Sequence, residues 1–462
     1  MTGLSSSEVV SFVFTEAARF QEQFARGDFR TGLERPLDGL HSIPDPKGDG
    51  YGALCIGPNA ERRLREFVES QVANGRYAGK LEVEPLVRQF KEEIVDRFIR
   101  RCVELSDDEA SAAFASSLVC SVSRTKELTH LIPCQLVNTS DPSAFEIGPV
   151  KFSHYDWRWP EIERQLQNWP TNPNYNDNTR QRLRQDIRTY YAEFNWLAEV
   201  TLAGWEPTPS RKAALEITTA AVEGLRLLLG GRQSNRLLVA GAAGHSHVRS
   251  HIVLASGKIE QTEVAHHSSI YPLDEGDWKW IESDEGTFLR RILGVAISSR
   301  FLVAEPTPLA IRFTDALHWY GLATEDTSAA AKLVLYLMAV ERLLLPTKTG
   351  AIRSTVKNRS AYFCDWEKHN EKIERLYGAR NDLSHGKRSP LSPDLADTAE
   401  LARWFARQVL IGTLWQSESA LKVEDFSSET LAAVLDDFHE RHKRLGKRGQ
   451  KANKVERPHD DR

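Results

Sequence analysis

The residues best suited to chemistry in this chain are an arginine and a histidine separated by four positions, Arg380 and His385. Arginine carries a permanent, planar positive charge, and histidine titrates close to neutral pH. RNA supplies its own nucleophile, the 2′-hydroxyl, so its cleavage needs only a proton relay and stabilisation of the charge on the reacting phosphate. The adjacent Asn381 adds an amide that can donate to that phosphate. We therefore predict Arg380, His385 and Asn381 as candidate catalytic residues for cleavage of RNA without a metal.

The sequence around this pair is typical of the last two turns of an amphipathic helix. Gly386 follows His385, and glycine is common after a helix end because the left-handed conformation costs it nothing. His385 would then lie at the negative end of the helix dipole, which favours the imidazolium ion by up to ~1 kcal/mol. Side chains five positions apart lie ~140° apart around a helix. A complete site therefore needs either unwinding at Gly386 or a second subunit that supplies a matching pair.

The spacing by itself is weak evidence, because an arginine is followed six residues later by a histidine at three other places. These are Arg35/His41, Arg124/His130 and Arg312/His318. What distinguishes Arg380/His385 is its context: the neighbouring amide of Asn381, the preceding aromatic Tyr377 and the terminating Gly386. The alternative is that Arg380 pairs with a carboxylate and His385 is an ordinary helix-end histidine.

Glu341 is the carboxylate most relevant to this alternative, because it interrupts the apolar run 335–345. A carboxylate in such a run must be paired or protonated, since an isolated buried charge is very unfavourable. An ion pair with an arginine of the helix that carries Arg380 is the common explanation, and a direct catalytic role is the rarer one. We assign Glu341, Tyr377 and Gly386 supporting roles.

A second group of chemically interesting residues is the set of histidines between residues 245 and 267. They are His245, His247, His251, His266 and His267. No acidic or cysteine ligand lies at a matching short spacing, and the glycine-containing segment 241–244 lacks the Lys-Ser/Thr of a phosphate-binding loop. We predict no metal and no cofactor.

The composition narrows the class of protein. A net charge of −4 over 462 residues gives no whole-molecule preference for nucleic acid, so any such binding must come from local patches. Five cysteines without a CxxC pair are typical of reduced thiols in the cytoplasm. No signal peptide and no apolar run of membrane-spanning length is present, and no DNA-reading helix stands out. We expect a cytoplasmic protein with no membrane partner.

The pattern of apolar residues predicts an α+β N-terminal and middle region followed by an all-α bundle of four to five helices. Residues 1–110 read as a helical region of unknown role, 111–305 as an α+β domain with a possible sensing or regulatory role, and 306–440 as the bundle. Residues 441–462 form a basic tail that we expect to be disordered. Within the middle region we predict strands at 118–122, 131–137, 145–152, 194–202, 237–240, 252–255 and 259–264.

Three stretches of the bundle carry a resemblance to a known family. Residues 313–321 and 336–344 resemble the first two core helices of the Apea-like branch of the HEPN superfamily, and 376–386 is similar to its signature of an arginine and a histidine with four residues between them. The resemblance covers about residues 308–415. One departure is the polar Ser384, where family members often carry an aliphatic residue.

This resemblance implies a fold and a function. Many HEPN proteins are metal-independent endoribonucleases of toxin or antiphage-defence systems, in which two signature helices meet across a homodimer and their arginine–histidine pairs form one cleft. It implies that RNA is the partner and that Arg380 and His385 carry the reaction. Other members keep the fold without catalysis and use it for dimerisation or for binding nucleotides and other ligands, which is the alternative for this chain.

Overall fold

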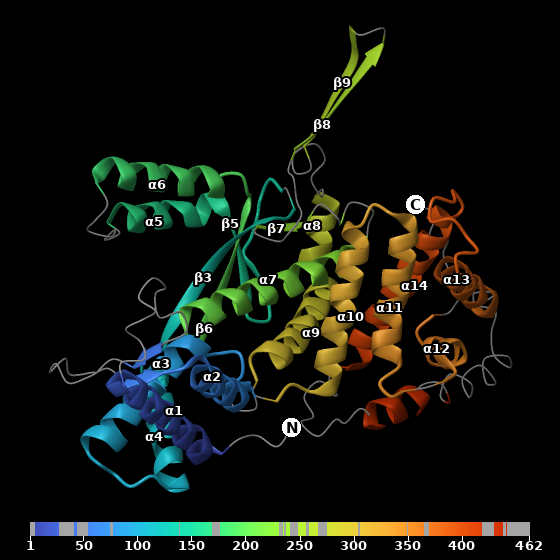
Figure 1. The fold of residues 1–462 in the computed structure, drawn as a ribbon. Coiled ribbons are helices and arrows are strands. Elements are labelled where there is room, and N and C mark those ends of the chain that lie inside the picture. Colours follow the sequence, from blue (N-terminus) through green and yellow to red (C-terminus); the bar gives the residue numbers. More distant parts are fainter. Residues whose placement is uncertain are drawn as a thin grey trace. The chain divides into compact units, whose positions relative to one another are not determined.

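A computed structural model gives the fold of the chain (Figure 1). It describes residues 5–26, 41–43, 54–73, 77–137, 139–168, 176–230, 234, 237–240, 248–255, 258–266, 275–303, 305–348, 350–364, 369–417, 429–437 and 440. Internal contacts divide the chain into two units, the first made of Met1–Thr129 with Thr201–Ala214 and the second of His130–Val200 with Leu215–Arg462. The predicted domain limits near residues 110, 305 and 440 do not coincide with this division and stay predictions. The predicted disordered tail lies outside the described residues.

The first unit is mainly helical. Its elements are α1 (Ser6–Arg26), β1 (His41–Ile43), β2 (Leu54–Ile56), α2 (Pro58–Ala73), α3 (Val83–Ile94), the π-helical turn η1 (Val95–Arg100) and α4 (Asp107–Ser123). Its core is built on the rings of Phe67, Phe90 and Phe114, whose centroids lie between 5.2 and 5.8 Å apart. This aromatic cluster joins α2, α3 and α4, because one ring comes from each helix.

The strand predicted at 118–122 is wrong, because these residues belong to α4. The Ser106 side chain caps this helix by accepting from the Glu109 backbone N–H, and three acidic residues fill its first turn. The buried residues of α4 recur at helical spacing, from Ala110 to Ser121. The strand-forming residues Leu118–Val122 are therefore helical, because they continue the helix that begins at Asp107.

A five-stranded antiparallel sheet runs through the middle of the chain in the order β4-β5-β6-β3-β7. Its strands are β3 (Lys126–Gln135), β4 (Phe145–Ile147), β5 (Val150–His154), β6 (Trp196–Trp205) and β7 (Leu238–Val239). Most of the predicted strands are confirmed, although 145–152 is a hairpin of two strands rather than one strand. A separate hairpin pairs β8 (Val248–Ala255) with β9 (Lys258–His266). The fold is thus α+β with a helical majority.

Five helices lie between or after these strands in the chain. They are α5 (Tyr155–Asn168), α6 (Asp177–Tyr191), α7 (Pro207–Leu229), α8 (Glu275–Glu282) and α9 (Asp284–Phe301). The aromatic side chains of Phe145, Trp196 and Trp278 pack against one another, with centroids 5.4 to 5.8 Å apart. This cluster fixes the β4 end of the sheet to helix α8, which leads into α9.

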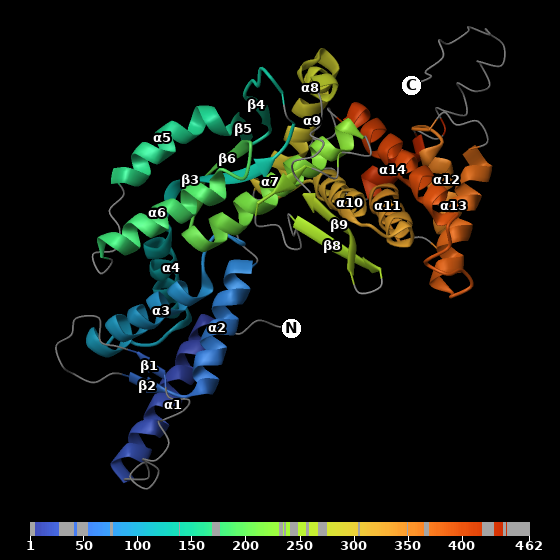
Figure 2. The same ribbon diagram turned by 90° about the horizontal axis from the view of Figure 1, so that it is seen from above.

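Five further helices pack on one another in the C-terminal part of the second unit (Figures 1 and 2). They are α10 (Pro308–Glu325), α11 (Ala329–Leu344), α12 (Ile352–Ser360), α13 (His369–Ser384) and α14 (Leu395–Ser417). The central helix is α11, which contacts the other four and has half of its residues buried. A helical bundle of this size is what the sequence predicts for this region. In the part of the chain that the structure describes, no helix has the length and apolar character needed to cross a membrane.

The β4–β5 hairpin approaches helix α9 at a contact between two glycines. A Cβ atom added at Gly294 would lie 2.3 Å from the backbone nitrogen of Gly148, and one added at Gly148 would lie 2.5 Å from the Gly294 carbonyl oxygen. Gly148 also has a φ of +58°, in the left-handed region that favours glycine. The hairpin and the helix therefore approach this closely only because neither residue carries a side chain.

We expect Gly294→Ala to lower the free energy of unfolding by about 1–3 kcal/mol, because backbone must move to admit the methyl group. The matched control is Gly378→Ala in helix α13, where an added Cβ meets nothing within 4 Å. That substitution should instead stabilise by roughly 0.5–1 kcal/mol through helix propensity. Urea denaturation measures the change in the free energy of unfolding for each variant. Equal changes in the two variants would contradict the close contact between Gly148 and Gly294.

Candidate active site

The predicted helix end at Gly386 is confirmed. Helix α13 ends at Ser384, and Gly386 has a φ of +68°. The backbone N–H of Gly386 donates to the Leu383 carbonyl over 3.1 Å, and that of Lys387 donates to the Asp382 carbonyl over 2.8 Å. These two bonds form a Schellman motif, which ends helices by satisfying their last carbonyl groups.

His385 is therefore the C-cap residue of α13. Its backbone N–H donates to the Asn381 carbonyl over 2.9 Å, so the chain follows the helix as far as His385. The histidine is exposed, and in the described part of the chain its imidazole forms neither a hydrogen bond nor an ion pair. Because the helix does not unwind before His385, its side chain and that of Arg380 stay ~140° apart around the helix axis.

Arg380 lies on the side of α13 that faces helix α11. Its Nη2 atom is 3.7 Å from Oε2 of Glu341, with the arginine side chain 30% exposed and the glutamate side chain 16% exposed. This is the ion pair that the position of Glu341 in an apolar helix predicts. It is a long and partly solvated contact, and such pairs contribute little to stability. Arg380 is thus held in place while part of its guanidinium remains open to solvent.

Tyr377 is the third member of this group. Its side chain is 2% exposed, and burial together with the neighbouring Glu341 carboxylate raises the pKa of its phenol, while Arg380 opposes that rise. Within the described residues, no hydrogen bond of normal geometry reaches the Tyr377 hydroxyl or Oε1 of Glu341. The phenol therefore stays protonated and can donate to a group that enters beside it.

A pocket of about 440 Å³ opens beside these side chains. Tyr377, Arg380 and Asn381 line it from α13, and the first turn of α12 with its preceding residues, 350–354, lines it from the other side. The N-terminus of a helix and an arginine both favour an anion, because exposed N–H groups and the guanidinium carry positive charge. His385 is not among the lining residues. In one copy of the chain, the structure places Arg380, Asn381, Tyr377 and Glu341 together and leaves His385 apart.

The competing pair Arg312/His318 has structural partners. Arg312 donates to the backbone carbonyls of Arg342 and Leu345, over 3.0 and 3.2 Å, and also to that of Pro346. It therefore caps the C-terminus of α11, where cations and donors are favourable. Of the other two competing pairs, one has Arg35 outside the described residues, and the other has Arg124 in the first unit and His130 in the second.

His318 forms a pair that the sequence did not reveal. Its Nδ1 atom lies 2.8 Å from Oε1 of Glu223, whose side chain is 4% exposed. The hydrogen bond to Glu223 raises the pKa of His318, and burial raises the pKa of Glu223. The sequence does carry a signal for a partner of Glu223, because this carboxylate lies in the apolar run of α7 as Glu341 lies in that of α11. Its partner, however, is 95 positions away and could not be identified.

Of the five histidines between residues 245 and 267, His245, His247 and His267 lie outside the described residues. His251 and His266 fall within the β8–β9 hairpin. The absence of a metal there stays a prediction.

Comparisons with known proteins find no match for this chain, whether with family models, with curated proteins or with solved structures. The functional interpretation therefore rests on the sequence and the geometry of the chain itself.

The Glu223–His318 pair makes stability depend on pH. Both folded pKa values are raised, so the folded chain binds protons more tightly than the unfolded chain. The contribution of His318 to the free energy of unfolding is fully present below its ordinary pKa of 6.5, and it is lost as the pH rises through the raised pKa. The contribution of Glu223 has the same sign and is lost as the pH rises from its ordinary pKa of 4.5 through its raised pKa. We expect the free energy of unfolding to fall above pH 6.5 more steeply than in the double variant Glu223→Gln/His318→Gln. Parallel pH profiles from urea denaturation would contradict this.

Proposed function

We propose that this chain is a metal-independent endoribonuclease of the HEPN type, acting in the cytoplasm as a toxin or an antiphage-defence effector. The proposal rests on the resemblance of residues 308–415 to Apea-like HEPN domains and on the chemistry of the α13 end. The observation that carries it is that a partly open Arg380 lines a pocket and an exposed His385 follows it five positions later on the same helix end. Residues 1–305 would sense a trigger or restrain the bundle.

The proposed reaction divides the work among three side chains. Arg380 binds non-bridging phosphate oxygens with its planar fork and stabilises the charge that develops on the phosphorane. His385 relays the proton between the 2′-hydroxyl and the leaving 5′-oxygen, an effect worth about 10²–10⁴-fold. Asn381, whose side chain lines the same pocket as Arg380, donates a further hydrogen bond to the phosphate. The 2′-oxygen forms the new bond to phosphorus and the 5′-oxygen bond breaks, which gives a cyclic phosphate.

The proposed active form is a homodimer. Within one copy, the two side chains lie ~140° apart on a helix that remains regular as far as His385. A second copy that places its α13 end against the first would bring His385 of one chain to Arg380 of the other. This arrangement is isologous, because the same surface acts on both sides.

The alternative is a non-catalytic HEPN protein that dimerises or binds a nucleotide through the same bundle. The contact between Arg380 and Glu341 favours it, since an arginine committed to a carboxylate is less available to RNA. In this case the pocket beside Arg380 would bind a ligand without cleaving it.

A cleavage assay on labelled single-stranded RNA in EDTA separates these proposals. We expect cleavage by the unmodified chain and a loss of about 10²-fold or more in both Arg380→Ala and His385→Ala. The control is Arg375→Ala on the same helix, where the arginine donates to Thr398 and lies outside the pocket beside Arg380. Arg380→Ala should keep its fold, because its ion pair is long and partly exposed. Unchanged cleavage in the Arg380 and His385 variants would contradict the roles proposed for these residues. No cleavage by the folded unmodified chain would favour the non-catalytic protein.

A further inference from the structure

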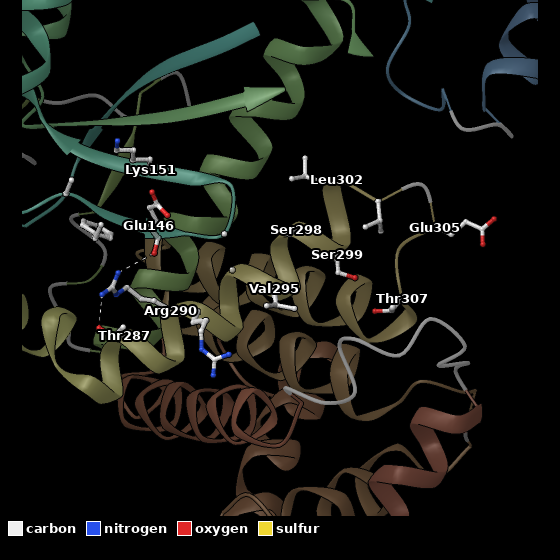
Figure 3. Close-up of a pocket in the computed structure, with 16 residues that line it drawn as sticks. Glu146, Lys151, Thr287, Arg290, Val295, Ser298, Ser299, Leu302, Glu305 and Thr307 are labelled. Carbon is white, nitrogen blue, oxygen red and sulfur yellow. Dashed lines mark hydrogen bonds between the residues drawn. The ribbon is translucent and has the colours of Figure 1, made fainter. Parts of the chain in front are cut away.

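The second unit contains a large cavity that the proposed ribonuclease site does not use (Figure 3). It measures about 1230 Å³ and lies between the β4–β5 hairpin and helix α9, extending to Thr307 at the start of α10. Ligand sites for small molecules usually measure ~300–1000 Å³, so this cavity is large enough for a nucleotide. None of its lining residues belongs to the pocket beside Arg380.

One end of the cavity is rich in cations and hydroxyl groups. Lys151 comes from β5, and Arg290 and Arg291 come from the first half of α9. The Thr287 hydroxyl accepts a hydrogen bond from Arg290 (Figure 3). Glu146 is the one carboxylate of the lining at this end. The local excess of positive charge favours an anionic ligand, and guanidinium groups with hydroxyls suit phosphate oxygens.

Arg290 is the residue that most needs such a ligand. It is partly buried, and its guanidinium donates to the Glu146 backbone carbonyl over 3.3 Å and to the Thr287 hydroxyl over 3.1 Å. Both acceptors are neutral, and the ring of Phe145 lies 5.4 Å from the guanidinium carbon. Among the described residues, Arg290 forms no ion pair and its buried Nε atom has no hydrogen-bond partner. The Glu282 carboxylate acts on Arg290 electrostatically but forms no ion pair with it. A partly buried cation without a directly paired counter-ion is unfavourable, and a bound anion would supply one.

The other end of the cavity carries three apolar side chains among polar ones. Val295, Leu302 and Val303 line it from the second half of α9 and the residues that follow, and the last two are unusually exposed for their type. Ser298, Ser299, Glu305 and Thr307 line the same end (Figure 3). Leu302, the C-cap residue of α9, lies twelve positions after Arg290, a distance of ~18 Å along the helix axis. The two ends are therefore far enough apart to hold different parts of one ligand.

We propose that this cavity is a binding site for a small organic phosphate of nucleotide size. Its phosphate groups lie against Arg290, Arg291 and Lys151, and its apolar part lies along Val295 and Leu302. The site is separate from the proposed active site, so it stands whether or not the chain cleaves RNA. If the chain is a nuclease, binding of a small molecule at this site can regulate the cleavage of RNA.

The test is isothermal titration of the full chain with ADP and, separately, with inorganic pyrophosphate. We expect ADP to bind, and to bind at least about tenfold more tightly than pyrophosphate, because only ADP reaches the apolar end. Arg290→Gln should weaken ADP binding about tenfold or more, since it removes the charged donor. The matched control is Arg300→Gln, which removes the same charge from the same helix outside the cavity.

A second variant, Val295→Trp, places a bulky ring in the cavity without changing its charge. It should also weaken ADP binding while the thermal unfolding transition is retained. The proposal is overturned if ADP fails to bind at millimolar concentration, or if pyrophosphate binds as tightly as ADP. It is also overturned if Arg290→Gln behaves like Arg300→Gln. Tighter binding of a short RNA oligomer than of ADP, lost in Arg290→Gln, would identify an RNA tract instead of a small-molecule site.

Discussion

The geometry of a regular α-helix constrains everything that the α13 end can do. Residues five positions apart cannot point in one direction, and the Schellman motif keeps the chain helical as far as His385 before it turns. The arginine is held against the bundle and the histidine is presented to solvent. Under the proposed function, one copy of the chain therefore carries the two chemical groups but not the finished site.

The packing of the bundle decides what Arg380 contributes. Glu341 lies on the central helix of the bundle, where a carboxylate needs a cation, and Arg380 provides one at 3.7 Å. The contact orients the guanidinium without removing it from solvent. Tyr377 completes the group with a buried phenol whose raised pKa keeps it protonated. A phosphate that enters the adjacent pocket would compete with Glu341 for Arg380 and gain a donor from Tyr377.

Local sequence patterns predicted much of the structure at the α13 end. The helix end at Gly386 follows from glycine chemistry, and the pairing of Glu341 follows from a charge in an apolar helix. Local patterns failed where tertiary context decided the outcome. Leu118–Val122 has strand-forming residues but lies in helix α4, which begins at the Ser106 cap. Glu223 pairs with His318, which is 95 positions away in the sequence. The cavity at Arg290 depends on two glycines, Gly148 and Gly294, that are distant in sequence.

The most direct measurement of the central claim is RNA cleavage by mixed dimers. Arg380→Ala and His385→Ala chains, each inactive alone, are co-expressed with different tags and the mixed dimer is purified. If Arg380 of one chain acts with His385 of the other, this dimer regains one complete site and cleaves RNA in EDTA. A dimer of unmodified chain with the Arg380→Ala/His385→Ala double variant should stay inactive. Cleavage by the second dimer and none by the first would place both residues in one chain and contradict the account.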